Sequence, residues 1–425
     1  MADVLQKPQV STPSSSATFF RQSGWLMIAN IGSGGLMWLV HFLSKKLTAA
    51  EYGAFGVMLA VALCVPTMPL QMVFAQQTAR AIAAKREREL ASMLRFACVG
   101  TLIVGLLLAG AVYCWQSEIL RGWKLTSPAG LWLTVAVVVL CMWLPIFQGV
   151  MQGQQNFLWI GWSNIFNGLG RLSIAATLVI ALAWGSTGMI TGVTLALILA
   201  VAICVWQTRD VWRLPRSPFN WRQLLPQVAP LLLGFAAVQF LFTADTMFVK
   251  AYFSEDDAGF YIGAGTLSRA LLWLVLPLAV VMFPKIVHST ARSEKSNLLG
   301  MVIVGTAILA MGGALGLTLL GPWVVKFVFK DSYVQVATVV LPWYAWAMVP
   351  LSLANVLVNN LLARAQFGIV PVLIALAAAY GIALTHFHDS LVMVLQTLGI
   401  FNLLLLAASA WFTFVNRKNA TLPLV

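Results

Sequence analysis

Charged residues are scarce in this sequence, and acidic residues are the scarcest. Only 9% of the 425 residues are charged while 60% are hydrophobic, and 13 Asp and Glu face 26 Lys and Arg. A water-soluble domain of this size could not cover its surface with so few charges. The composition therefore excludes a soluble protein and indicates an all-α integral membrane protein, because helices satisfy their own backbone hydrogen bonds in lipid.

Motifs of common enzymes and of ATP-driven pumps are also absent. The chain contains no GxxxxGK[ST] phosphate-binding loop, no HExxH and no GxSxG. It also has no long loop outside the membrane, which an enzyme acting there on a lipid-linked sugar would need. We therefore predict a protein that is not an enzyme.

Paired cysteines and a secretory leader are missing too. The five cysteines have no paired spacing, so the sequence indicates neither a disulfide framework nor a metal site. Residues 1–23 are rich in Ser and Thr and lack the apolar core and cleavage site of a signal peptide. We predict that they form a disordered cytoplasmic tail.

Long apolar runs, by contrast, account for most of the chain. A helix that crosses a bilayer needs about 20 mostly apolar residues. We predict about twelve such spans: Gly24–Leu43, Gly53–Ala75, Leu94–Trp115, Ala129–Met151, Leu158–Ala183, Thr187–Trp206, Ala229–Tyr252, Ala258–Phe283, Leu298–Gly321, Val336–Leu362, Ile369–Thr385 and Leu391–Val415.

The distribution of Lys and Arg predicts the orientation of these spans. With both termini in the cytoplasm, the inside segments hold more than twice as many Lys and Arg as the outside loops. This is the bias expected of cytoplasmic loops. The net charge of +13 then reflects topology and attraction to anionic membrane lipids, and nothing indicates binding to nucleic acid.

Two pairs of segments repeat each other at nearly the same offset. Gly53 and Phe55 match Gly259 and Tyr261 after 206 residues, and "FQGVMQGQQNF" resembles "LVNNLLARAQFG" about 210 residues later. Six spans per half is an even number, so the halves should be related by an axis along the membrane normal. We predict a six-helix bundle over 24–206, a cytoplasmic linker over 207–228, a second six-helix bundle over 229–415 and a cytoplasmic tail over 416–425.

Three charged side chains stand well inside predicted spans, where charge is costly and usually has a function. They are Arg171, Asp245 and Arg269. Arg171 follows Asn164 and Asn167 along one helical face, and Lys250 ends a polar stripe in the seventh span. Two arginines against one acid leave a positive charge unpaired, and guanidinium binds phosphate well. We predict that Arg171, Arg269, Asn164, Asn167 and Lys250 bind an anionic substrate.

Asp245 has two interpretations. It either pairs with an arginine as a structural clamp between helices, or it acts as a titratable or cation-binding carboxylate that couples transport to protons or sodium. In the second case a coupling cation would take part, and the sequence indicates no other cofactor.

Several segments resemble a known family. They are "LSKKLTAAEYGAFG" after the first span, "GVMQGQQNF" after the fourth, "SRALLWLVLPLAVVMFPKI" in the eighth and "PWVVKFVFKDSYVQVATVVLPWYAWAMVP" around the tenth. In order and spacing these are similar to the O-antigen and exopolysaccharide repeat-unit flippases of the multidrug/oligosaccharidyl-lipid/polysaccharide exporter superfamily. The resemblance covers most of the chain from Gly24 to Phe414. The chain stops after its twelfth span, unlike fourteen-helix relatives.

The resemblance implies a transporter of the bacterial cytoplasmic (inner) membrane that moves undecaprenyl-pyrophosphate-linked glycan units between leaflets. It also implies a polysaccharide polymerase and a chain-length regulator as partners. An ion-coupled drug or metabolite exporter of the same fold is the alternative, and a membrane polymerase or ligase of the lipid-linked sugar is a further one.

Overall fold

The structure is a computed structural model that describes residues 15–215, 217, 218, 220–272 and 298–415. No strand occurs in this part of the chain. The long helices are α1 (Ser15–Leu39), α2 (Ala49–Leu63), α3 (Thr67–Ala83), α4 (Glu87–Cys114), α6 (Pro128–Gly153), α7 (Phe157–Ile180), α8 (Gly185–Gln207), α10 (Trp221–Tyr252), α12 (Leu298–Val328), α13 (Ser332–Ala363), α14 (Val370–His386) and α15 (Leu391–Ala410). Residues 255–272 are helical as well.

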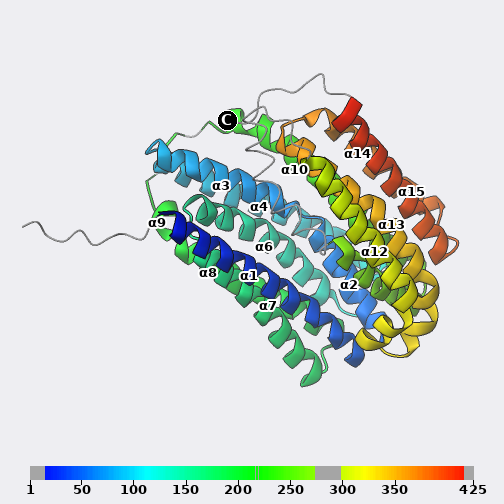
Figure 1. Cartoon of the computed structure of the whole chain (residues 1–425). Coiled ribbons are helices and arrows are strands. Elements are labelled where there is room, and N and C mark those ends of the chain that lie inside the picture. Colours follow the sequence, from blue (N-terminus) through cyan, green and yellow to red (C-terminus); the bar gives the residue numbers. More distant parts are fainter. Residues whose placement is uncertain (1–14, 216, 219, 273–297, 416–425) are drawn as a thin grey trace, which may run out of the picture.

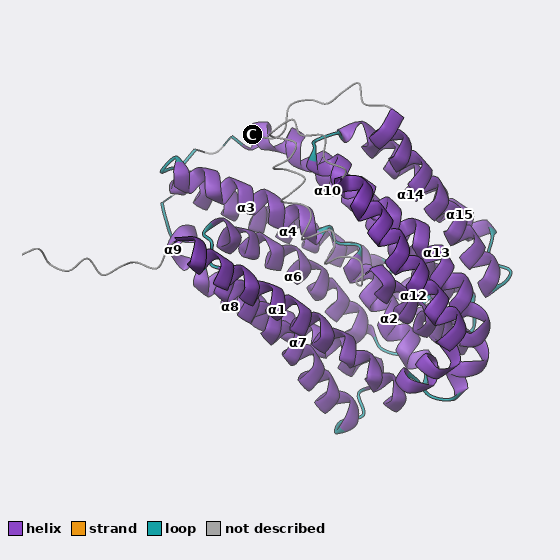
Figure 2. Cartoon of the chain, in the orientation of Figure 1, coloured by secondary structure: helices purple, strands orange, loops and turns teal. Residues whose placement is uncertain are grey.

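Short helical turns extend or join these helices. They are η1 (Val40–Lys46), α5 (Gln116–Gly122), α9 (Arg209–Trp212), η2 (Phe367–Ile369) and the π-helical turn η3 (Trp411–Val415). Figure 2 shows the helical composition of the chain.

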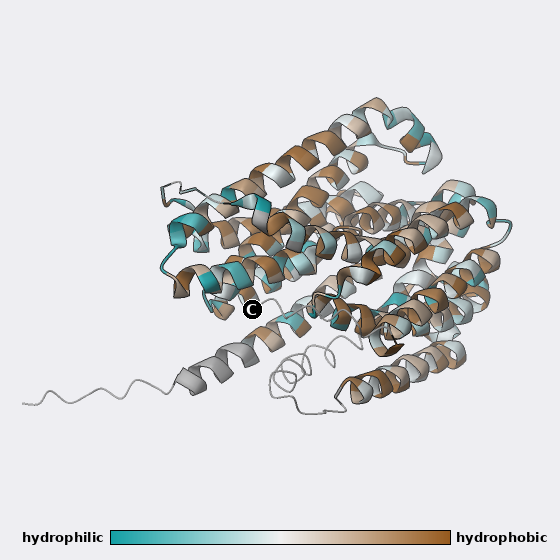
Figure 3. Cartoon of the chain, turned by 90° about the horizontal axis from the view of Figure 1, so that it is seen from above, coloured by the Kyte–Doolittle hydropathy of each residue, from teal (hydrophilic) through white to brown (hydrophobic). Residues whose placement is uncertain are grey.

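The protein is an all-α membrane protein with about twelve transmembrane helices in two six-helix bundles. Among the described residues, ten segments are long and apolar enough to cross a membrane. The 24-residue α7 and the helical residues 255–272 correspond to two further predicted spans. Hydrophobic residues run along the helices and hydrophilic residues gather at their ends (Figure 3), as a bilayer requires.

The N-terminal bundle contains α1 to α8, in which α7 packs against α1 and α8, and α6 packs against α3 and α8. The C-terminal bundle contains α10, residues 255–272 and α12 to α15, in which α13 packs against α12 and α15, and α10 packs against α14. Figure 1 shows the two groups of helices and places α9 at one end of the molecule. Across the groups, α10 packs against α2 and α3.

The bundles also meet at a seam between residues 44–56 and residues 250–266, at the end opposite to α9. Here the matched glycines of the sequence repeat face each other, because a Cβ added to Gly53 would lie 3.2 Å from the Gly259 Cα. Equivalent residues that touch each other must lie near the pseudo-twofold axis. The contact between the two glycines therefore fits the predicted symmetry.

Some predicted boundaries shift in the structure. α1 begins at Ser15, so residues 15–23 are helical and the disordered tail predicted for 1–23 does not extend over them. The predicted linker 207–228 contains α9, and α10 begins at Trp221 because its first turns already pack against the N-terminal bundle. Residues 1–14, the end of the eighth predicted span and the tail 416–425 lie outside the described residues.

Small residues let helices approach closely at some GxxxG pairs and not at others. A Cβ at Gly149 would lie 2.5 Å from the Gln71 carbonyl oxygen, and one at Gly153 would lie 2.4 Å from the Thr78 Cβ. These glycines therefore allow α6 to touch α3. Gly312 and Gly316, which form another GxxxG pair, have no described atom within 4 Å of an added Cβ.

We expect Gly149→Ala to destabilise the protein by about 1–3 kcal/mol, because the new methyl group forces α3 and α6 apart. Gly312→Ala is the matched control, and it should be neutral or slightly stabilising because alanine is the better helix former. Thermal unfolding in detergent would measure both. Equal melting temperatures for the two variants would contradict close packing at Gly149.

Candidate functional site

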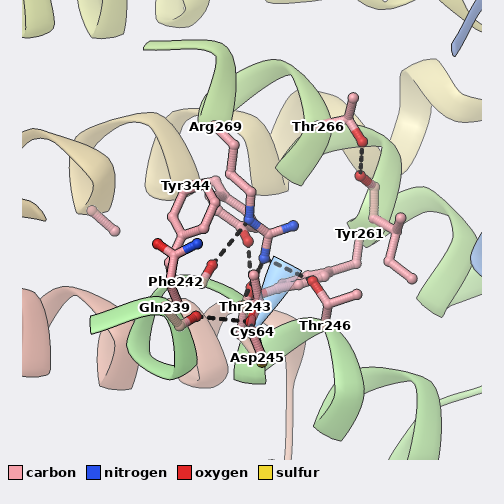
Figure 4. A network of polar contacts seen from close by, with 12 residues as sticks. Cys64, Gln239, Phe242, Thr243, Asp245, Thr246, Tyr261, Thr266, Arg269 and Tyr344 are labelled. Atoms are coloured by element: carbon pink, nitrogen blue, oxygen red, sulfur yellow. Dashed lines mark hydrogen bonds and ion pairs between the residues drawn. The ribbon is translucent and has the colours of Figure 1, made fainter. Parts of the chain in front are cut away.

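Asp245 lies at the centre of a closed polar cluster in the C-terminal bundle. Its side chain on α10 is 0% exposed. Arg269 Nη2 donates to Asp245 Oδ1 at 2.8 Å and to Oδ2 at 3.0 Å, and the Tyr261 hydroxyl donates to Oδ2 at 2.9 Å. The Tyr344 hydroxyl of α13 donates to the same oxygen (Figure 4). The carboxylate thus joins α10, residues 255–272 and α13.

The Arg269 guanidinium makes further contacts through Nε, Nη2 and its face. Its Nε donates to the Phe242 carbonyl oxygen at 3.1 Å and its Nη2 donates to Thr246 Oγ1 at 2.7 Å. Its Cζ lies 5.4 Å from the ring centroids of Phe242 and Tyr344, within range of a cation–π interaction. Of the two pairings that the sequence allows for Asp245, the structure contains the one with Arg269.

Arg171 on α7 has a different environment. Its Nε is buried and has no hydrogen-bond partner, and no carboxylate of the described residues forms an ion pair with it. It interacts electrostatically with His41 of η1 and Cys141 of α6, neither of which is a carboxylate. Arg171 is therefore a cation within a span that has no counter-charge among the described residues, which is unusual in a membrane protein unless a ligand supplies one.

A chain of hydrogen bonds connects the surroundings of Arg171 to the other bundle. His41 Nδ1 and the Tyr52 hydroxyl lie 2.8 Å apart, and that hydroxyl lies 3.1 Å from Thr266 Oγ1. Thr266 is one helical turn from Arg269. His41, Tyr52 and Thr266 thus form a line of polar contacts across the seam, between the surroundings of Arg171 and those of Arg269.

The predicted amide residues have mixed surroundings. Asn164 donates to Asn30 Oδ1 at 2.7 Å and accepts from Gln148 Nε2 at 2.7 Å. These bonds tie α7 to α1 and α6, so Asn164 serves helix packing. Asn167, one turn before Arg171, is buried, and its Oδ1 has no hydrogen-bond partner.

Lys250 is not brought together with Arg171 by any described contact. It is fully buried at the seam, where its Nζ lies 3.5 Å from the Ala50 carbonyl oxygen. An apolar groove of about 570 Å³ lies between α10 and α14 and is lined by none of the predicted site residues. The predicted set therefore divides into the Asp245 cluster, the Arg171 region and the seam.

Sequence reasoning missed the tyrosines of the site. Five of the seven tyrosines in the chain are fully buried, and Tyr52, Tyr261 and Tyr344 bond within the site. A hydroxyl inside an apolar run needs a polar partner in the same way as a charge does. The scarcity of tyrosine, combined with its position inside spans, was the available signal.

The sequence matches a known protein family. The model of a family described as Polysaccharide biosynthesis protein matches residues 19–290, which is more than half of the chain. Among curated proteins, none matches the sequence significantly.

Solved structures share the fold over almost the whole chain. An inward-facing multidrug resistance MATE family transporter of the MOP superfamily has a TM-score of 0.68 at 11% identity, covering 89% of this chain and 92% of its own. The lipid II flippase MurJ in an inward closed conformation has a TM-score of 0.68 at 13% identity, covering 93% and 87%. A mutant of the MATE transporter VcmN from Vibrio cholerae has a TM-score of 0.58 at 12% identity, covering 95% and 99%.

We expect Asp245→Asn to lower the free energy of unfolding by about 3–5 kcal/mol, because it leaves the buried Arg269 charge without its counter-ion. The double variant Asp245→Asn/Arg269→Gln should recover part of this loss. Chemical denaturation in detergent would measure the coupling between the two residues.

The matched control is Asp331→Asn, which breaks the exposed pair with Lys326 and should cost at most about 1 kcal/mol. Strictly additive effects of the Asp245 and Arg269 substitutions would contradict the clamp.

Proposed function

The chain belongs to the family of polysaccharide biosynthesis proteins, and on that premise we propose that it is a flippase for lipid-linked oligosaccharides. Its cargo would be an oligosaccharide repeat unit on undecaprenyl pyrophosphate, moved from the inner to the outer leaflet of the bacterial cytoplasmic membrane. Two bundles joined at a seam suit alternating access, in which the seam closes one side of the membrane while the other is open.

Arg171 is the observation that carries the proposal. Its Nε is buried without an acceptor, and no described acid neutralises it. A pyrophosphate supplies both what the guanidinium lacks, oxygen acceptors and negative charge, in a geometry that suits paired donors. Asn167 Oδ1, one helical turn away and equally unpartnered, is an acceptor for a sugar hydroxyl.

Asp245 takes the structural role in this proposal. Its two oxygens accept from Arg269, Tyr261 and Tyr344, so a coupling cation would have to displace a guanidinium that is already in place. The pair keeps the C-terminal bundle rigid while the bundles move against each other. In this proposal Arg269 does not bind the substrate, because it pairs with Asp245, and Arg171 is the cation that binds the cargo.

The same charge pattern opposes the exporter alternative. A carrier of cationic drugs needs an intramembrane acid that is free to bind the drug, whereas the buried acid here is paired and the unpaired charge is positive. We place both termini in the cytoplasm and the seam outside, because the basic turn between α3 and α4 and the basic α9 lie at the other end. A polymerase and a chain-length regulator would use the delivered cargo.

We expect loss of the protein to cause lipid-linked single repeat units to accumulate on the inner leaflet. Spheroplasts of a deletion strain would be treated with a glycosidase from outside, and the units should resist cleavage. Cleavable units would instead indicate a block in polymerisation or ligation. Absence of accumulation would favour the exporter.

We expect Arg171→Gln to reduce translocation by roughly tenfold to a hundredfold, the loss anticipated for a hydrogen bond to a charged group. Arg171→Lys should retain part of the activity because it keeps the charge without the paired donors. Translocation would be measured with the same glycosidase assay, at matched protein abundance.

The control is Arg95→Gln, because Arg95 bonds to the Trp212 and Leu214 carbonyl oxygens away from the site. Normal translocation by Arg171→Gln would contradict the assignment of Arg171 to the cargo.

A further inference from the structure

Two lysines cross the seam in opposite directions. Lys124, between α5 and α6 of the N-terminal bundle, donates from Nζ to the Phe253 carbonyl oxygen of the C-terminal bundle. Lys330, between α12 and α13 of the C-terminal bundle, donates from Nζ to the Leu47 carbonyl oxygen of the N-terminal bundle at 2.6 Å. Each bond therefore spans the two bodies that alternating access would separate.

The two bonds are equivalent under the internal repeat. Lys124 and Lys330 are 206 residues apart, and so are the acceptors Leu47 and Phe253. This is the offset that relates Gly53 to Gly259 at the same seam. A bond and its symmetry mate are thus formed by matched donors and matched acceptors, which a chance surface contact would not produce.

The acceptor sites also share their local geometry. Leu47 directly follows η1 and Phe253 directly follows α10, and both have extended backbones. The next residue in each case caps the following helix, since Glu51 N donates to Thr48 Oγ1 and Asp257 N donates to Ser254 Oγ. These two pairs of residues also differ by 206 positions. A carbonyl at a helix C-terminus carries partial negative charge and favours a lysine.

The backbones of the two bundles are in direct contact next to these lysine bonds. A Cβ at Gly259 would lie 2.1 Å from the Ala49 carbonyl oxygen, so the chains touch directly. Ser44 Oγ adds a bond to the Val328 carbonyl oxygen at 3.2 Å. Separation of the bundles at this end must therefore break both lysine bonds.

We propose that Lys124 and Lys330 are paired gate residues that hold the seam closed and release together when the transporter opens to the outside. Their acceptors are main-chain carbonyls, so the strength of each bond depends on the register of the two bundles and not on a second side chain. The proposal rests on the alternating-access part of the proposed function and is independent of the cargo.

The test measures opening of the seam in purified protein reconstituted in nanodiscs. Ile262 is 2% exposed and packs on Gly56 across the seam, so Ile262→Cys reports opening through its reaction with a membrane-impermeant maleimide. Cys114, the exposed native cysteine, is first replaced by serine. The same protein without Ile262→Cys measures the background labelling of the remaining native cysteines.

Lys124→Met and Lys330→Met each remove a donor while keeping an unbranched side chain that is one atom shorter. Each should raise the labelling rate of Ile262→Cys by about tenfold, and the double variant should raise it further, because each lost bond shifts the balance towards the open seam. The two single variants should have similar effects, since the bonds are symmetry mates. Lys124→Arg and Lys330→Arg should restore slow labelling even if a methionine variant folds poorly.

Lys326→Met is the matched control, because this exposed lysine pairs with Asp331 of its own bundle. Labelling rates for the double variant within twofold of the parent would overturn the proposal, as would an equal rise in Lys326→Met. Labelling does not depend on transport. If labelling is unchanged while the deletion strain accumulates protected repeat units, the gate proposal is wrong and the flippase proposal stands. If labelling rises as expected but no protected units accumulate, the gate proposal stands and the flippase proposal is wrong.

Discussion

Burial of the Asp245 carboxylate in a bilayer is the constraint on which the C-terminal bundle depends. Hydrocarbon offers no water to a charge, so every lone pair of the carboxylate has to find a protein donor. Arg269 supplies the counter-charge, and Tyr261 and Tyr344 supply the remaining donors. Three helices are fixed relative to one another by this requirement. A bundle whose core is closed in this way can move as a rigid body, as the proposed alternating access requires.

The two bundles share an internal sequence repeat and differ in their charges. Positions 206 residues before Asp245 and Arg269 are Leu39 and Leu63, so the N-terminal bundle has no such pair. Conversely, at the offset of about 210 residues that holds for the neighbouring repeat, the position equivalent to Arg171 is Gly381, which carries no charge. The repeat therefore preserved the seam, where backbone contacts and caps must match, and left the interiors free to diverge. The C-terminal interior contains the Asp245–Arg269 ion pair, and the N-terminal interior contains Arg171, which no described acid neutralises.

The fold alone does not specify the charges inside the bundles. The solved relatives share the helix arrangement at 11–13% identity, which leaves the interior side chains unspecified. The proposed flippase for an anionic lipid needs a cation that the protein itself does not neutralise, and we propose Arg171 for that role. His41, Tyr52 and Thr266 form hydrogen bonds that lead from the surroundings of Arg171 to the opposite bundle. The surroundings of Arg171 are therefore in contact with the seam.

The sequence by itself determined the class of protein and the approximate spans, because a bilayer requires apolar segments of a fixed length. It also determined the two-bundle symmetry, because the repeat is visible in the spacing of matched residues. It also identified Arg171, Asp245 and Arg269 as exceptional, since charge within a span is costly wherever the chain places it. Only the tertiary structure decided which arginine Asp245 takes, because Arg171 and Arg269 are equally basic and their distances depend on how α7, α10 and residues 255–272 pack. The same holds for Lys124 and Lys330. Their acceptors are main-chain carbonyls, which every residue possesses, so only the approach of the two bundles selects Phe253 and Leu47.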